Sequence, residues 1–162
     1  MTGLQRGLLV GGFQLALVLS MAGKYAVDRQ TLPRVWVRVT PYDPNLPVRG
    51  RYVRLQVHTA LRGAMTNKVV LYGSAELSID NGQLIATSTD ADTGVQVYRD
   101  TDSTATLTEP VAYFIPEHGP DPSRRPEGEE LWAEVSIPKR GPPRPVRLGV
   151  KRTGKIVPLD LN

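Results

Sequence analysis

The hydrophobic pattern changes character near residue 30. Between residues 7 and 23 apolar residues follow one another without a charge, whereas from residue 35 onward they alternate with polar ones. A continuous apolar run of this length is typical of a helix that crosses a bilayer, and alternation with period two is typical of half-buried strands. The sequence therefore predicts an N-terminal helix followed by a β domain.

Residues 7–27 are predicted to form the membrane helix. The uncharged residues 7–23 would span about 25 Å as a helix, and three further residues bring the length to the hydrocarbon thickness. Two alternatives remain open: a signal peptide cleaved after Ser20-Met21-Ala22, and a buried core helix. Arg6 precedes the run and four cations follow it, so a strict positive-inside count would point against an exported domain. The basic, apolar, small-residue order of a signal favours export. We expect residues 1–6 to form a cytoplasmic tail and residues 28–34 a linker.

Residues 35–162 are expected to form one exported all-β domain, an antiparallel sandwich or open barrel of nine to eleven short strands. Val35, Val37 and Val39 begin the alternation. Longer strands are indicated near residues 35–39, 53–58, 131–137 and 146–151, with shorter ones at 68–72, 75–79, 83–88, 94–99, 104–108 and 111–115. Asn81-Gly82 predicts a tight hairpin turn and Thr153-Gly154 a final one. The proline-rich residues 141–145 are expected to connect strands.

Small residues recur at four-residue spacing along the helix. Gly12, Ala16 and Ser20 form one such row. In lipid, a row of this kind lets two helix backbones approach closely, which favours a partner helix. Glycine is also common in membrane helices without any such role.

The amino-acid composition excludes several kinds of catalytic and metal site. The chain has 162 residues, a formal charge of +4, no cysteine and two histidines, so thiolate metal sites and cysteine nucleophiles are excluded. Asp90, Asp92 and Gly94 match only part of a calcium loop, which we interpret as an acidic turn. A serine–lysine pair of Ser74 and Lys68, or a triad through His58 or His118, has no flanking motif. We therefore expect no catalytic residue, metal or cofactor.

The segment VTPYDPNLPVRGRYVRLQV resembles the bacterial GDYXXLXY family. The resemblance rests on Asp43-Pro44, then Arg49, Gly50, Tyr52 and Leu55, and continues in Phe114-Ile115-Pro116-Glu117 and Trp132-Ala133-Glu134-Val135. It implies a small protein with a membrane helix and one exported domain, and it leaves the biochemical activity open. This chain departs from the motif at two places, because Arg51 replaces its aspartate and Val57 its last tyrosine.

Two interpretations of the motif region remain open. In the first, Gly50 supplies backbone freedom where the chain enters a strand. In the second, Arg49, Arg51, Tyr52 and Arg54 form a contact patch.

The C-terminal stretch from Pro138 to Pro158 is basic throughout. Its cations are Lys139, Arg140, Arg144, Arg147, Lys151, Arg152 and Lys155, with no acidic residue among them. On a tethered domain these residues could rest on anionic lipid headgroups, and the alternative is a solvated strand face. Nucleic-acid binding is not expected, because the stretch carries no aromatic residue beside its cations.

These observations predict a non-catalytic accessory or scaffold protein of the bacterial inner membrane, with its domain in the periplasm, that binds an integral membrane partner. The alternative is a membrane-tethered enzyme or ligand-binding domain that uses the rim of residues 50–55.

Overall fold

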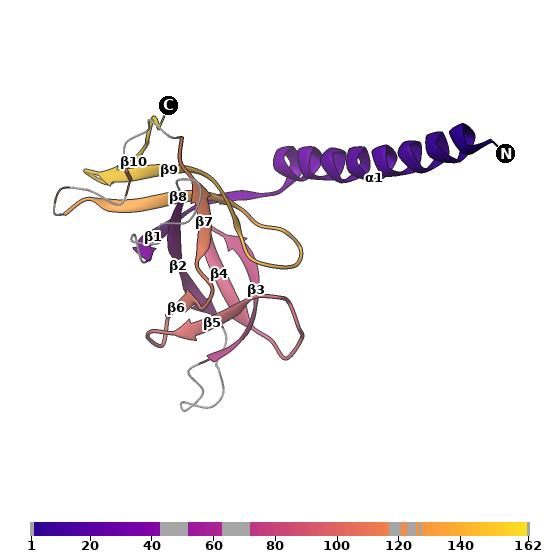
Figure 1. Ribbon diagram of the computed structural model, residues 1–162. Helices are drawn as coiled ribbons and strands as arrows, with labels where there is room; N and C mark the ends of the chain where they lie inside the picture. Colours follow the sequence, from indigo (N-terminus) through magenta and orange to yellow (C-terminus); the bar gives the residue numbers. More distant parts are fainter. Residues whose placement is uncertain are drawn as a thin grey trace. The chain divides into compact units, whose positions relative to one another are not determined.

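The computed structural model describes residues 2–42, 52–62, 72–116, 121, 122, 126 and 128–161. The chain divides into two units, residues 1–32 and residues 33–162. The first holds one helix and the second holds ten strands among the described residues (Figure 1). The predicted all-β domain after an N-terminal helix is confirmed.

Helix α1 runs from Gly3 to Thr31. Its 29 residues correspond to about 43 Å, so it extends beyond the apolar run at both ends. At the start, Thr2 and Gln5 form a capping box, and the Thr2 N–H donates to Gln5 Oε1 at 2.9 Å. The helix ends before Pro33, because the proline ring clashes with the residue before it when that residue is helical. Only Leu32 and Pro33 separate α1 from the first strand, so the linker is shorter than expected.

The strands begin directly after this proline. They are β1 (Arg34–Tyr42), β2 (Tyr52–Arg62), β3 (Tyr72–Asp80), β4 (Gln83–Ser88), β5 (Gln96–Arg99), β6 (Thr104–Leu107), β7 (Val111–Phe114), β8 (Glu130–Ser136), β9 (Arg144–Arg152) and β10 (Lys155–Pro158).

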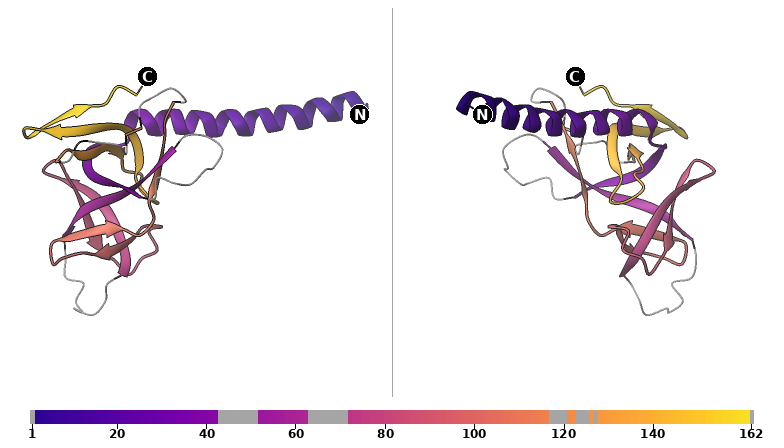
Figure 2. Two further views of the ribbon diagram at one scale, coloured as in Figure 1. Left: turned by 60° about the vertical axis from the view of Figure 1, so that its left-hand side comes forward. Right: turned by 90° about the vertical axis from the view of Figure 1, so that its right-hand side faces the viewer.

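Strands β2, β4, β3, β5 and β6 form a closed barrel, because β6 pairs back with β2. The pairs are antiparallel except β2 with β4, which is parallel. The barrel is thus closed rather than open, and not purely antiparallel. Strands β1, β8, β9 and β10 extend the sheet from β2, so the barrel lies at one end of the domain and β8–β10 at the other (Figure 2).

The turns follow the local sequence. Asn81 and Gly82 have φ angles of 49° and 74°, the left-handed pair that a tight hairpin needs. Thr153 and Gly154 repeat this geometry between β9 and β10. The prediction for residues 141–145 is wrong at its end. Pro145 lies within β9, opposite Val135, where a β-bulge interrupts the ladder and removes the need for its missing N–H.

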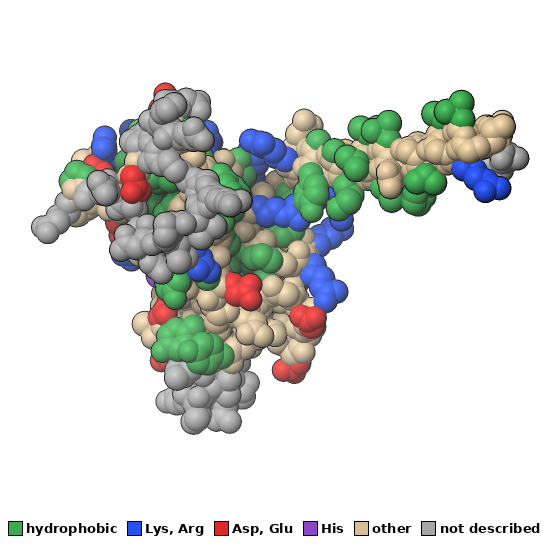
Figure 3. Space-filling view, viewed as in Figure 1, with side chains coloured by type: hydrophobic (Ala, Val, Ile, Leu, Met, Phe, Trp, Pro, Cys, Tyr) green, Lys and Arg blue, Asp and Glu red, His purple; other side chains and the backbone are tan. Residues whose placement is uncertain are grey.

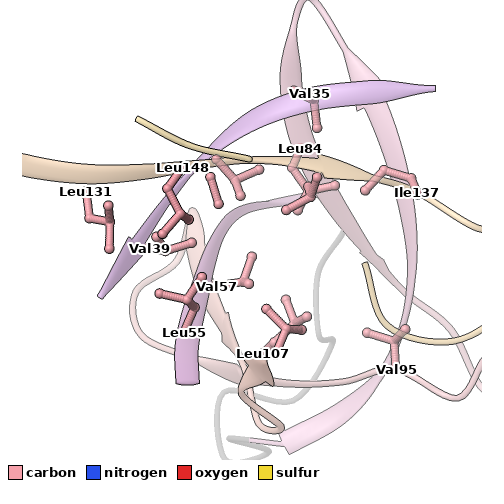
Figure 4. Packing of buried hydrophobic residues seen from close by; sticks show 14 of the residues in the cluster. Val35, Val39, Leu55, Val57, Leu84, Val95, Leu107, Leu131, Ile137 and Leu148 are labelled. Atoms are coloured by element: carbon pink, nitrogen blue, oxygen red, sulfur yellow. The ribbon is translucent and has the colours of Figure 1, made fainter. Parts of the chain in front are cut away.

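The core is made mainly of the residues that point inward from the strands, where buried and outward positions alternate along the chain. Leu55 and Val57 of β2 are fully buried and belong to one cluster with residues of β1, β4, β6 and β9 (Figure 4). Val35, Val37 and Val39 supply the β1 share of this core. Because every residue of the buried cluster lies between Val35 and Leu161 and none comes from α1, the β domain completes its core without the helix.

Candidate functional site

Strand β2 changes neighbours along its length, and this creates a large hollow in the described part of the domain. On one edge β2 pairs first with β1, from Arg54 to Val57, and then with β4, from Ala60 to Arg62. Strands β1 and β4 therefore diverge from a fork at His58. The fork opens into a groove of about 840 Å³, a size typical of ligand sites. We call this hollow the fork groove.

Two side-chain contacts link β1, β2 and β4 near the fork. The Thr40 hydroxyl on β1 lies 3.1 Å from His58 Nε2 on β2. Beside it, the buried Thr59 hydroxyl donates to the Leu84 carbonyl of β4 at 2.9 Å. These contacts hold the three strands at the point where they part.

His58 belongs to a hydrogen-bonded chain that ends at a carboxylate. The Thr106 hydroxyl donates to Asp100 Oδ2 at 2.6 Å, so its oxygen accepts from His58 Nδ1 at 3.0 Å. The proton of a neutral imidazole therefore sits on Nδ1, and Nε2 accepts from Thr40. Burial lowers the pKa of His58 below its usual 6.5; the Asp100 carboxylate opposes this and the Arg38 guanidinium adds to it. The arrangement favours a neutral, oriented imidazole at neutral pH.

Both tryptophans of the chain line the fork groove. Trp36 lies on β1 and Trp132 on the neighbouring β8, diagonal to each other on one face of the sheet. The Arg147 guanidinium lies 5.4 Å from the centre of the Trp36 ring, and Lys151 Nζ lies 4.9 Å from that of Trp132. Such contacts fix the indoles in place.

These contacts correct the prediction that no aromatic residue lies beside the C-terminal cations. Aromatic platforms do lie beside C-terminal cations, although none stands within residues 138–158. They come from β1 and β8, which the sheet places next to β9. The alternation of Trp36 and Trp132 with buried valines and leucines indicated their outward position, but their meeting with Arg147 and Lys151 depends on strand order.

Gly149 makes room for Trp36. A Cβ atom at this position would lie 2.9 Å from Trp36 Cζ3 and 2.9 Å from the Val157 carbonyl oxygen. It would also lie 3.0 Å from Ile156 Cγ2. The absence of a side chain at Gly149 thus allows the Trp36 indole to pack against β9 and β10.

The structure brings two segments of the GDYXXLXY resemblance together. Tyr52 on β2 is directly opposite Phe114 on β7, and their ring centres lie 6.2 Å apart. Arg54 lies over the Tyr42 ring at 5.7 Å. Leu55 points into the core and is fully buried, so it cannot belong to a contact patch. Pro116 follows β7. The motif residues Asp43, Arg49, Gly50, Arg51 and Glu117 lie outside the described residues.

The basic C-terminal residues are spread over several contacts. Arg140 pairs with Asp92 at 2.9 Å, Arg147 with Glu134 at 2.7 Å and Arg152 with Glu129 at 2.8 Å. With Lys151 on the Trp132 ring, four of the seven cations contact other parts of the domain. Lipid contact by this stretch stays a prediction, as do the roles of Lys139, Arg144 and Lys155.

In the acidic turn of residues 90–94, both carboxylate oxygens of Asp92 accept hydrogen bonds from other groups of the protein. Asp92 Oδ1 accepts from the Gly94 N–H at 3.1 Å, and its other oxygen binds Arg140. No group of three potential metal ligands occurs among the described residues. Lys68 and His118 lie outside the described part of the chain.

Helix α1 is long and apolar enough to cross a membrane. Its apolar side chains are exposed along its whole length (Figure 3). Gly12, Ala16 and Ser20 lie on one face by their spacing, and the Ser20 hydroxyl donates within the helix to the Leu17 carbonyl at 2.8 Å. A hydroxyl bonded in this way presents a small surface to a neighbour.

Comparison with known proteins gives no relative: no family model, no curated protein and no solved structure matches this chain.

Proposed function

We propose that this protein is a single-pass accessory subunit of the bacterial inner membrane, with its β domain in the periplasm. In this proposal α1 anchors the chain and binds an integral membrane partner, and the domain provides a second contact without catalysis. The observation that carries the proposal is the division of the chain. Every residue of α1 is outside the buried core, whereas the β domain builds its core without the helix.

Exposed apolar side chains on this scale require a nonaqueous neighbour. Leu8, Leu15 and Leu19 are each at least 60% exposed in α1. Buried apolar area contributes about 25 cal/mol per Å², so a helix of this composition is stable in lipid and not in water. The small-residue row of Gly12, Ala16 and Ser20 then offers the surface for a partner helix.

Co-purification in mild detergent tests the proposal. Gly12→Leu and Ala16→Leu should break association with a larger membrane protein, because each adds bulk to the small-residue row. Gly11→Leu is the matched control, since it adds the same bulk as Gly12→Leu but points away from the row of Gly12, Ala16 and Ser20. Equal loss in all three variants, or no partner for the native chain, would contradict the proposal. The intact mass of the mature chain distinguishes an anchor from a cleaved signal peptide.

A second candidate function is ligand binding by the domain. The fork groove, with its two indoles and oriented imidazole, favours this function at a different place from the rim of residues 50–55. A metabolite that binds the full chain and quenches its tryptophan emission, while α1 variants keep that binding, would support this function over the accessory role.

A further inference from the structure

The fork groove runs along the edge of a strand. Five consecutive residues of β1, from Arg34 to Arg38, line it. Successive side chains of a strand point to opposite faces of a sheet, so a hollow that touches all five must lie beside the strand. Among the strands that the structure describes, this part of β1 pairs only with β8. The edge toward β4 is the fork groove.

The hydrogen-bond pattern shows which backbone groups point into the fork groove. The Ile137 N–H donates to the Pro33 carbonyl at 3.0 Å, immediately before the ladder of β1 with β8. In an antiparallel ladder such pairs alternate, so Val35 and Val37 are hydrogen-bonded to β8. Trp36, between them, directs its N–H and carbonyl to the other edge. An extended chain lying in the fork groove would find these groups at the spacing of a strand partner.

The side chains beside this edge define the kind of extended chain. On the outer face, Trp36 is followed two residues later by the exposed Arg38, so a cross-strand neighbour would be apolar opposite Trp36 and acidic opposite Arg38. On the inner face, Val35, Val37 and Leu84 favour apolar residues. The Arg38 side chain is 57% exposed and lies 3.6 Å from Glu130, so its five N–H donors leave room for a second carboxylate.

We infer that the fork groove binds an extended peptide segment of a partner protein, which adds a strand to β1 along Arg34–Arg38. Main-chain hydrogen bonds supply the affinity and the alternating pockets supply the specificity. The inference deepens the proposed function, on which it rests for the nature of the partner. Since β1 begins three residues after α1 ends, the segment comes from the part of an integral membrane protein that adjoins its own membrane helix.

Amide hydrogen exchange on the full chain in detergent tests the open edge. The Trp36 amide should exchange faster than those of Val35 and Val37, which donate to β8. Equal protection of all three amides would show that the edge is already paired and would overturn the inference.

Binding of defined probes tests the occupant. The probe is an acetylated, amidated nine-residue peptide that alternates valine with polar residues, with glutamate on either side of a central outward phenylalanine. The chain has two tryptophans, and both line the fork groove, so their emission reports binding directly. We expect the emission to shift and the Trp36 amide to become protected. No shift with the peptide at millimolar concentration would overturn the inference.

Two N-methylated forms of the probe separate strand addition from side-chain contact. Methyl groups on the amides that face β1 should weaken binding about tenfold or more, whereas methyl groups on the alternate amides should change it little. The register cannot slip by one residue to compensate, because every side chain would change face. Equal affinity of both forms would overturn the inference.

Reversing the charge of Arg38 tests its role in selecting the peptide. Arg38→Glu should reject the glutamate probe and accept one with lysine at those positions, because its side chain is exposed and its backbone is unchanged. Unaltered preference would contradict the role given to Arg38. If the chain instead dimerises through this edge, concentration-dependent protection of Trp36 without any probe will show it and will overturn the choice of occupant.

The two proposals fail separately. Loss of co-purification in the Gly12→Leu variant with intact peptide binding concerns α1 alone. Failure of the probes while co-purification persists removes the strand addition and leaves the membrane role.

Discussion

The substitution Gly149→Ala tests how closely Trp36 and β10 pack against β9 at Gly149. The new Cβ would lie 2.9 Å from Trp36 Cζ3, 2.9 Å from the Val157 carbonyl oxygen and 3.0 Å from Ile156 Cγ2. Real Cβ atoms do not approach backbone oxygens so closely, so either β10 or the indole must move.

The magnitude follows from two opposing effects. Alanine restricts the unfolded chain and would alone stabilise the protein by about 0.5–1 kcal/mol relative to glycine. Overpacking against well-fixed neighbours costs about 1–3 kcal/mol. Because one of the three contacts is a backbone atom that cannot rotate away, we expect a net destabilisation of about 1–2 kcal/mol.

Chemical denaturation of the full chain in detergent, followed by tryptophan emission, measures this change. Trp36→Phe removes the indole atom that clashes, so the double variant Gly149→Ala/Trp36→Phe should lose less stability than the sum of the single variants. A free energy of unfolding equal to that of the native chain would refute the reasoning. So would strict additivity of the two substitutions.

Three further predictions concern the core, one turn and one titrating group. Leu55→Ala should destabilise the domain by about 2–5 kcal/mol because Leu55 is fully buried, whereas the partly buried Leu77→Ala should cost less, as measured by urea denaturation; equal losses would contradict this. Asn81→Val should cost about 1–2 kcal/mol because a β-branched residue must adopt a φ of 49°, whereas Asn81→Gly should be tolerated, and thermal unfolding of both decides it. The lowered pKa of His58 means that the unfolded chain binds its proton first, so stability should fall as the pH drops from about 6.5 toward the folded pKa and then level off. The variant His58→Gln should lack this part of the pH dependence, and an unchanged profile would contradict the assignment.

Much of the fold follows from local sequence. Alternation around Val35 and around Leu131 predicted β1 and β8, because one buried face imposes period two. Asn81-Gly82 predicted its hairpin because few residues adopt two left-handed conformations in succession. The apolar run predicted α1 but not its ends, which depend on the capping box at Thr2 and on Pro33.

The candidate site could not be predicted in the same way. Its parts lie far apart in the chain: His58 meets Thr106, and Trp36 meets Arg147. Their meeting depends on β2 exchanging β1 for β4 and on β8 lying beside β1, which no local pattern specifies. Pro145 was assigned to a connection for the same reason, since the bulge that accommodates it is a property of the pairing with β8.

The position of β1 between β2 and β8 has a consequence for biogenesis. Val35 pairs with Val135 and Val37 with Ala133, so the first strand to be synthesised waits for residues about a hundred positions later. If the domain is threaded across a bilayer from its N-terminal end, β1 cannot acquire this neighbour until most of the polypeptide has emerged. During that interval the valines of β1 are available to factors that bind nascent chains, and truncation before residue 130 leaves β1 without its β8 neighbour.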